Sequence, residues 1–255
     1  MTWGVVAALY RHPVKGFTPE RIQSAVLTAG DCFPTDRLFA VENGPSGFDP
    51  ANPKHVKKQK FTVLARSPVV AQLNTKFEDE TGLFHVTTPD GASKAFAIHT
   101  AEGQTELATF LSRQFADVFD GDLKTLEGPG AHRFTDHPKG HVSLLNLASV
   151  KTASEAFGTP VDPLRFRMNI HIDGLSSWAE DDLNSGDVLR LGDAELTILA
   201  PTVRCMATHA NPETGTYDLD TVPLLKTAFD RVTLGLYANV SKSGTVREGD
   251  LLEQL

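Results

Sequence analysis

Turn-forming residues interrupt this chain at short intervals, and this feature limits its fold more than any other. Proline and glycine make up 15 and 20 of the 255 residues, and many lie only a few positions apart. Residues 43–53 combine Gly44, Gly47 and three prolines, Pro45, Pro50 and Pro53, which block regular structure there. The apolar runs between such turns are short. The pattern therefore predicts many short strands and few, short helices.

Apolar periodicity places the expected elements. Leu107, Phe110, Leu111 and Phe115 recur at helical spacing, with Thr105 as a candidate N-cap, and Asn146 is placed to cap a second helix. A third short helix is expected over residues 223–229. Alternating or continuous apolar runs predict strands over residues 5–10, 22–27, 36–41, 61–66, 142–145, 165–173 and 234–240, and hairpins over 83–99 and 187–199.

These elements do not alternate regularly between strand and helix, which argues against a doubly wound parallel sheet. The expected fold class is mainly β (α+β) with a barrel. The turn-rich Glu127-Gly128-Pro129-Gly130 lies near the expected boundary between two domains. We therefore divide the chain into residues 1–122, a smaller β-rich domain, and residues 123–255, a β-barrel domain.

Composition excludes several classes of protein. The net charge is −8, so a global basic field for nucleic acid is absent. The two cysteines form no disulfide framework, which favours a reducing, cytoplasmic compartment. No apolar run approaches the roughly 20 residues that span a bilayer, so no membrane partner is expected. The first apolar run lacks a preceding basic segment and is interpreted as a strand rather than a signal peptide.

Cys205 follows the apolar run Leu196-Thr197-Ile198-Leu199 and has Arg204 beside it. A thiol next to a permanent positive charge is a candidate thiolate, hence a nucleophile or a soft metal ligand. The plainer alternative is a packed apolar cysteine. His209, four residues later, leaves a Cys–His nucleophilic pair open. Cys32 has no such neighbours and is interpreted as structural.

Basic residues border several predicted strand ends and turns. Taken singly, each is explained as a surface charge, but together they have the chemistry to hold a phosphorylated ligand near a thiolate. The set consists of Lys15, Arg37, Arg165, Arg167 and Arg204. Lys54, Lys57, Lys58 and Lys60 form a second group, either a solvated loop or an anion-attracting rim.

Ordered motifs across the chain resemble those of the MOSC family, named after the C-terminal domain of molybdenum cofactor sulfurase. The resemblance covers nearly the whole chain, including the β-barrel domain that precedes MOSC in many members. Its motifs, in order, are Pro13-Val14-Lys15-Gly16, Asp36-Arg37, residues 144–149, Arg165-Phe166-Arg167-Met168-Asn169-Ile170, residues 178–181, Gly186-Asp187, Pro201-Thr202-Val203-Arg204-Cys205, residues 211–215, residues 225–227 and Gly249-Asp250.

The resemblance implies that Cys205 ligates the molybdenum of a molybdopterin cofactor. It also implies a pterin and phosphate pocket lined by Lys15, Gly16, Arg37, Asn146, Arg167 and Asn169, with Arg204 helping to keep the thiolate ionised. This chain departs from the family pattern at two of these positions. Gly16 stands for a serine, which removes a hydroxyl contact, and Met168 stands for a proline, which relaxes the backbone before Asn169.

Three functions follow as hypotheses. The first, implied by a likeness to the amidoxime-reducing component, is a molybdenum-dependent oxidoreductase that reduces small N-hydroxylated substrates. Its electrons would come from a separate electron-transfer protein or reductase, since no cysteine cluster for an iron–sulfur centre is present. The second is a carrier or sulfur-transfer module for the molybdenum cofactor, without turnover of its own. The third is a structural protein whose cysteine is only packed.

Overall fold

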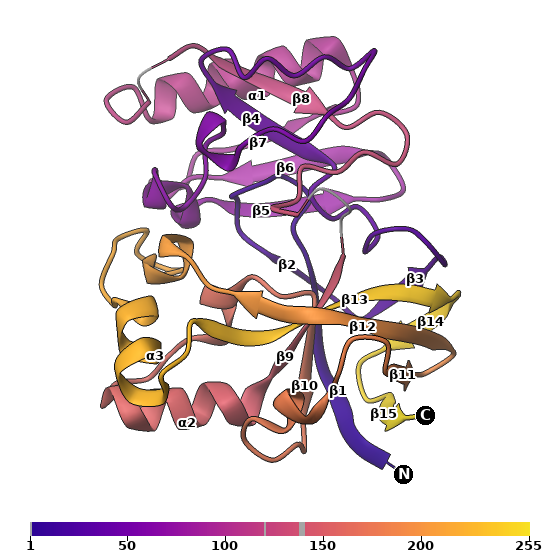
Figure 1. The fold of residues 1–255 in the computed structure, drawn as a ribbon. Helices are drawn as coiled ribbons and strands as arrows, with labels where there is room; N and C mark the ends of the chain where they lie inside the picture. The colour runs from indigo at the N-terminus through magenta and orange to yellow at the C-terminus, as the bar shows by residue number, and fades with distance from the viewer. Residues whose placement is uncertain (1, 120, 138–140) are drawn as a thin grey trace.

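The protein is built on a closed barrel of seven strands, which lies in the lower half of Figure 1. The computed structural model describes residues 2–119, 121–137 and 141–255. Around the barrel the strands follow in the order β10-β9-β13-β12-β11-β15-β1, and β1 pairs with β10 to close it. They are β1 (Thr2–Arg11), β9 (Val142–Asn146), β10 (Ile170–Asp173), β11 (Val188–Leu191), β12 (Ala194–Val203), β13 (Thr233–Lys242) and β15 (Leu251–Gln254).

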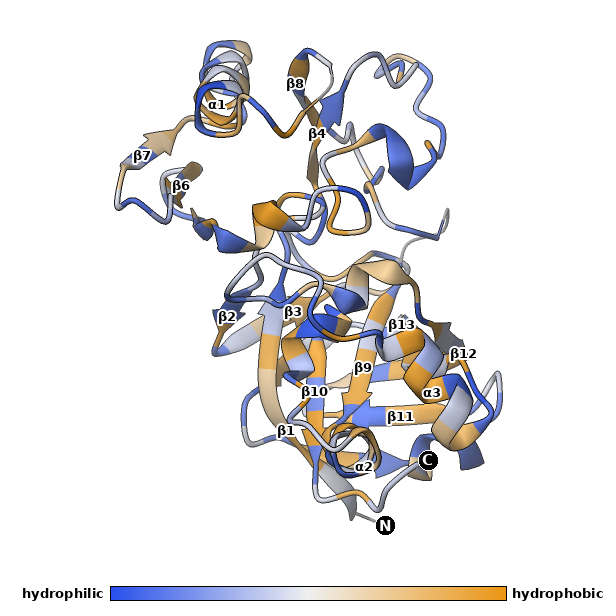
Figure 2. Cartoon of the chain, turned by 90° about the vertical axis from the view of Figure 1, so that its left-hand side faces the viewer, coloured by the Kyte–Doolittle hydropathy of each residue, from blue (hydrophilic) through white to orange (hydrophobic). Residues whose placement is uncertain are grey.

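Apolar side chains fill the barrel, because alternate residues of each strand face inward. Leu9, Ile170, Leu196 and Leu236 belong to this buried cluster. Figure 2 shows the corresponding strands as the most hydrophobic part of the chain. Two short flanking strands extend the structure: β2 (Glu20–Ile22) pairs with β1, and β3 (Ser24–Leu27) pairs with β14 (Gly244–Arg247).

Two helices cover one side of the barrel. The helices α2 (Leu147–Phe157) and α3 (Thr221–Phe229) pack through Val150 and Leu225 against a second apolar cluster. Asn146 caps α2 as expected, since its side-chain oxygen accepts a hydrogen bond from the Ala148 amide at 3.0 Å. We call this unit, the seven strands with α2 and α3, the barrel domain.

A second unit lies above the barrel in Figure 1 and is called the α1 domain here. It consists of the pair β4 (Phe39–Asn43) and β8 (Leu123–Glu127), the sheet β5 (Asn74–Glu78), β6 (Leu83–Thr87) and β7 (Ser93–Phe96), and the helix α1 (Ala101–Gln114). Its core is rich in phenylalanine, with Phe39, Phe84 and Phe96 almost completely buried. Short 3₁₀ turns η1 (Lys58–Lys60) and η2 (Pro68–Gln72) lie between β4 and β5.

The expected fold class is confirmed. The described residues are mainly β, with a barrel, a smaller β-rich unit and three α-helices. The predicted domain boundary between residues 122 and 123 stays a prediction. In the structure the first strand, β1, belongs to the barrel, whereas β8 pairs with β4 in the α1 domain. Within the described ranges, no helix is long and apolar enough to cross a membrane.

One predicted strand is wrong throughout and a second is wrong over its first five residues. Residues 61–66 form turns rather than a strand, with Phe61 and Val63 inserted into a small apolar cluster. Residues 165–169 also leave the β conformation: the 3₁₀ turn η3 (Pro163–Phe166) is followed by Arg167 with φ +54°, and β10 starts only at Ile170. Apolar alternation in both segments reflects buried side chains on an irregular backbone.

The first helix begins earlier than its apolar spacing indicates, which gives a test. The N-cap is Thr100, whose hydroxyl oxygen accepts a hydrogen bond from the Gly103 amide at 3.0 Å; the predicted cap, Thr105, lies inside the helix. We expect T100A to lower the free energy of unfolding by about 1 kcal/mol. Chemical denaturation should show a clearly smaller loss for T105A, and equal losses would contradict the assignment.

A buried histidine in the barrel makes stability depend on pH. Burial, followed by the charge of Arg21, lowers the pKa of His171 to about 4. Below the unfolded pKa of about 6.5 the unfolded chain binds a proton here that the folded protein does not, so stability is lost as the pH falls. Between pH 7 and pH 5 we expect His171 to contribute a loss of about 2 kcal/mol.

Denaturation of H171F at both pH values checks this contribution. Phenylalanine keeps the ring contact with Tyr10, whose centroid lies 4.7 Å away, and removes the titrating group. H171F should therefore lose less stability than the wild type on acidification. The same loss in both proteins would show that His171 does not carry the effect.

Candidate functional site

A cleft that is partly open to solvent lies where the barrel and α1 domains meet. Both domains and the segment that follows β1 contribute to its walls. Of the residues that the family resemblance assigns to the pocket, seven line this cleft: Lys15, Gly16, Arg37, Arg167, Asn169, Arg204 and Cys205. The structure brings these residues together from positions as far apart as 15 and 205. Asn146 is not among the residues of the cleft.

Lys15 places a buried ammonium group in the cleft wall. Its Nζ donates to the Phe134 carbonyl at 2.7 Å and to Asp136 Oδ1 at 2.6 Å. Burial opposes the charge on Asp136, but the nearby cations, Lys15 first and then Lys58 and Arg37, outweigh it and hold the pKa of Asp136 well below its usual range. The carboxylate therefore remains ionised and balances part of the positive charge in the cleft.

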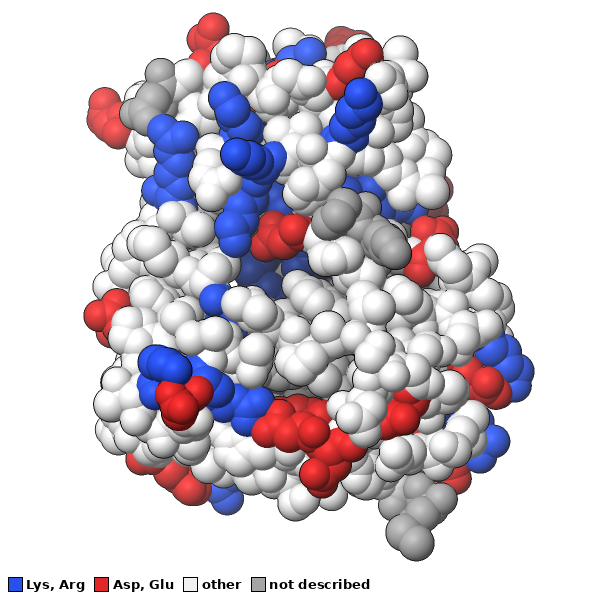
Figure 3. All heavy atoms as spheres, in the orientation of Figure 1, with Lys and Arg blue, Asp and Glu red and all other residues white. Residues whose placement is uncertain are grey.

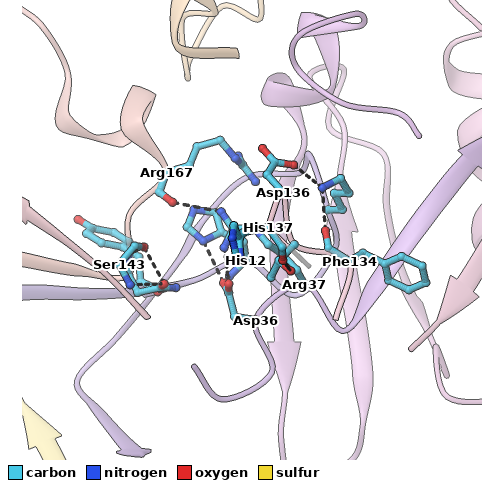
Figure 4. Close-up of polar contacts among 12 residues, drawn as sticks. His12, Asp36, Arg37, Phe134, Asp136, His137, Ser143 and Arg167 are labelled. Carbon is cyan, nitrogen blue, oxygen red and sulfur yellow. Dashed lines mark hydrogen bonds and ion pairs between the residues drawn. The ribbon is translucent and has the colours of Figure 1, made fainter. Parts of the chain in front are cut away.

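A second buried carboxylate orients Arg37. Asp36 accepts from the His12 amide at 2.8 Å and forms an ion pair with Arg37. Burial again disfavours the charged form, but Arg37 and His12 lower the pKa of Asp36 far below its usual range. Arg37 also donates to the Arg167 carbonyl at 3.2 Å, which links the α1 domain to the barrel domain. The guanidinium is thus fixed from both sides of the cleft (Figure 4).

Arg167 has one unused donor. Its Nη1 donates to the Phe17 carbonyl at 2.7 Å, but its buried Nη2 has no hydrogen-bond partner within the described part of the chain. Burial, together with the charge of Arg37, lowers the pKa of Arg167 to about 9. Two guanidinium groups and the Lys15 ammonium therefore face one cleft, and Figure 4 shows Arg37, Asp136 and Arg167 directed into the same space. A buried guanidinium donor without a partner, beside two further cations, favours an anionic ligand.

Asn169 and Arg204 hold the cleft wall in place. The Asn169 side-chain oxygen accepts from the Ser143 hydroxyl at 2.8 Å, and its amide nitrogen donates to the Tyr10 carbonyl at 3.2 Å. Arg204 donates to the Leu234 and Phe166 carbonyls and to the Met168 sulfur, at 2.9, 2.9 and 3.1 Å. Met168, which stands where the family has a proline, thus contacts Arg204, the residue beside Cys205.

Cys205 lies just after β12, at the start of the 3₁₀ turn η5 (Met206–His209), and is half-buried. The cation at its sulfur is Lys58, whose Nζ lies 3.1 Å from Sγ. Lys58 also lies 3.8 Å from Asp136 and comes from η1, in the opposite domain. From the sequence, Lys58 was only one of four closely spaced lysines, and its contact with Cys205 was not predicted. The high density of lysines in this loop was the one sign of a binding role.

The remaining candidates lie away from this centre. His209 accepts from the Val222 amide at 3.3 Å and pairs with Asp220, so its ring contacts the start of α3. Arg165 lines the cleft but donates to the His209 carbonyl and to Asp218. Asn146 caps α2 and donates to Glu180 at 2.7 Å. Its side chain thus serves the helix and a buried carboxylate.

Two further residues named in the sequence analysis are Cys32 and Gly16, the glycine in the loop after β1. Cys32 is a free, half-buried thiol whose pKa is raised by burial. At Gly16 (φ +88°) a Cβ atom would lie 2.3 Å from the Thr62 carbonyl oxygen. In the part of the chain that the structure describes, no group of three or more His, Cys, Asp or Glu side chains is arranged to hold a metal ion.

Profiles of two domain families match this chain. The profile described as the MOSC domain matches residues 131–253, and the profile described as the MOSC N-terminal beta barrel domain matches residues 3–125. Together the two matches cover nearly all of the chain. They include every residue that we place in the cleft.

Curated relatives match over a shorter region. The chain is 30% identical over 121 residues to mitochondrial amidoxime reducing component 2 of Rattus norvegicus, covering 43% of this chain and 35% of that protein. It is 31% identical over 119 residues to mitochondrial amidoxime-reducing component 1 of Mus musculus, covering 42% and 34%. The chain thus spans about a third of the length of these relatives.

Solved structures show weaker likeness. The YUAD protein of Bacillus subtilis aligns over 99% of this chain and 94% of its own, with a TM-score of 0.46 and 12% identity. YiiM of Escherichia coli aligns over 45% and 53%, with a TM-score of 0.35 and 20% identity. Both scores are low, so neither similarity bears on the site.

The close approach at Gly16 predicts a difference between two glycines. G16S should lower the free energy of unfolding by about 3 kcal/mol, because the left-handed backbone and the contact with the Thr62 carbonyl both oppose a side chain. Gly30 has a similar φ of +79° but nothing within 4 Å, so G30S should cost only about 1 kcal/mol. Denaturation of the two variants checks this, and equal losses would exclude the contact as a cause.

Proposed function

Because the chain belongs to the MOSC family, with a MOSC N-terminal β-barrel domain before the MOSC domain, we propose that its cleft binds the molybdenum–molybdopterin cofactor and reduces N-hydroxylated compounds. The observation that supports the proposal is a set of buried basic side chains beside a thiol, among which Arg167 Nη2 has no partner in the described part of the chain. Lys15, Arg37 and Arg167 surround the cleft that also contains Cys205. The curated relatives named as amidoxime reducing components supply the reaction class.

The residues present fit such a cofactor. A pterin phosphate offers several acceptor oxygens, and the buried Arg167 Nη2 is a donor that no described residue uses. Gly16 lies beside Lys15 in the wall of the cleft, where a Cβ would collide with the Thr62 carbonyl. In the proposed complex these groups would hold the anionic end of the cofactor. Arg37 would be oriented for that contact by Asp36.

Cys205 would supply the protein ligand to molybdenum, since a thiolate is the soft donor that such a site needs. When bound, the cofactor would supply the two-electron redox chemistry. Lys58, hydrogen-bonded to Sγ at 3.1 Å, would hold the sulfur at the cleft, with Asp136 keeping the ammonium in place. The walls formed by both domains would shield the reacting atoms from bulk water.

The overall reaction would cleave an N–O bond of the substrate, consume two electrons and two protons, and release water. A separate electron-transfer protein or reductase would supply the electrons. Both cysteines are free thiols in the structure, in keeping with the reducing, cytoplasmic compartment that belongs to this proposal. The activity, substrate and partner are proposals, since the chain spans only part of the curated relatives' length.

Metal content tests the proposal. Protein from a host that makes the molybdenum cofactor should contain molybdenum when wild type, and C205A should lose most of it because its ligand is gone. C32A is the matched control and should keep the wild-type content. Elemental analysis after purification measures all three, and reduction of an amidoxime with an artificial donor then measures turnover. An empty wild-type protein would contradict the proposal, and full metal without turnover would favour the cofactor carrier.

A further inference from the structure

Large apolar side chains stand exposed around Cys205, at the mouth of the cleft. Val203 is 67% exposed, Met206 is 52% exposed and Tyr217 is 42% exposed. Val203 and Met206 flank the cysteine in sequence, and the Tyr217 hydroxyl reaches across to donate to the Leu64 carbonyl of the opposite domain at 2.6 Å. We call these three side chains the mouth patch. Exposed apolar groups gathered in one place typically mark an interaction site.

Lysines line the opposite edge of the same opening. Lys57 and Lys60 are exposed at η1, on either side of Lys58, whose Nζ contacts Cys205 Sγ. This contact brings the turn η1, which with its N-cap Lys57 carries all three lysines, next to Cys205. We call Lys57, Lys58 and Lys60 the lysine rim. The whole chain carries a net charge of −8, so this concentration of positive charge is a local exception.

An apolar centre with a charged edge is the usual anatomy of a transient protein–protein interface. We propose that the mouth patch and lysine rim form the docking surface for an acidic electron-transfer protein. The inference rests on the proposed function, and it specifies the chemistry and the place of the electron donor. A carrier seated there would lie directly over Cys205, the proposed metal ligand. Its acidic side chains would face Lys57 and Lys60, and its exposed apolar atoms would cover Val203 and Met206.

The charge distribution favours a protein over a lipid surface. On the face shown in Figure 3, basic side chains gather over the α1 domain and the boundary, whereas acidic ones gather over the barrel domain below. A flat anionic membrane would meet both regions at once and be repelled by the second. A small carrier would cover only the basic region. Electron-transfer complexes are typically of this small size.

Electrostatic steering gives the surface a measurable signature, because charges at the rim of an interface act mainly on the rate of association. The molybdenum-loaded protein is mixed with a reduced, acidic plant-type [2Fe–2S] ferredoxin as the probe, together with an amidoxime. The measured quantity is the second-order rate constant for ferredoxin oxidation, at low and at high ionic strength. Reduced methyl viologen, a small cation, serves as the reference donor.

Three single charge reversals are compared with the wild type: K57E, K60E and K151E. Lys57 and Lys60 are exposed neighbours of Lys58 at η1 and do not line the cleft, and Lys151 is an exposed residue of α2 that provides the matched control. At low ionic strength K57E and K60E should each slow ferredoxin oxidation about tenfold, and added salt should remove the difference. K151E should behave like the wild type. With reduced methyl viologen no variant should be slowed.

The outcomes separate this inference from the proposed function. If methyl viologen drives turnover but the ferredoxin rate is insensitive to K57E, K60E and salt, the docking surface is wrong and the reductase proposal stands. If methyl viologen drives no turnover, the reductase proposal fails. Binding of oxidised ferredoxin to the same variants then decides the surface, and binding unaffected by K57E overturns it. If the wild type binds phosphatidylserine vesicles and K57E does not, the surface binds a membrane, and the proposal of a docking surface for an electron-transfer protein is wrong.

Discussion

The cleft depends on one buried carboxylate, that of Asp36. An ionised carboxylate in the protein interior is costly unless cations and hydrogen bonds compensate for it. Here the His12 amide and the Arg37 guanidinium provide that compensation, and Arg37 continues to the Arg167 carbonyl of the barrel domain. A single interaction network therefore connects the loop after β1, the α1 domain and the barrel domain. The Asp36 carboxylate also offsets part of the repulsion between Arg37 and Arg167.

The same network requires an uncommon backbone. Arg37 and Arg167 both adopt positive φ, at +51° and +54°, where side chains with a Cβ are disfavoured. Strain of about 1–2 kcal/mol at such positions persists only where the surrounding contacts enforce it, and it is often found at functional sites. Both residues direct guanidinium groups into the cleft. The packing of the protein thus holds two like charges close together. This arrangement is unfavourable in the unliganded protein and would be relieved by an anionic ligand.

Much of this arrangement followed from the sequence, and the exceptions have physical causes. The barrel strands β1, β9, β11, β12 and β13, and α2 with its Asn146 cap, were predicted, because apolar periodicity and capping act locally. The turns at residues 61–66 and the left-handed Arg167 were missed, because contacts with distant segments fix them. Lys58 was missed as the neighbour of Cys205 for the same reason: no local pattern relates positions 58 and 205. Resemblance to a family grouped the cleft residues, and it also included Asn146, which the fold uses elsewhere.

The barrel has a consequence for how the chain acquires its structure. Its first strand, β1, pairs with β10 and with β15, which contains residues 251–254. During synthesis the α1 domain therefore emerges after β1 and before β10 and β15. The edge of β1 that pairs with these two strands stays unpaired until they have been synthesised. Long-range pairing of this kind slows folding and exposes apolar edges to other chains. The strand whose continuation carries Lys15 to the cleft therefore gains its early partner β2 from the neighbouring segment, but its partners β10 and β15 only late in synthesis.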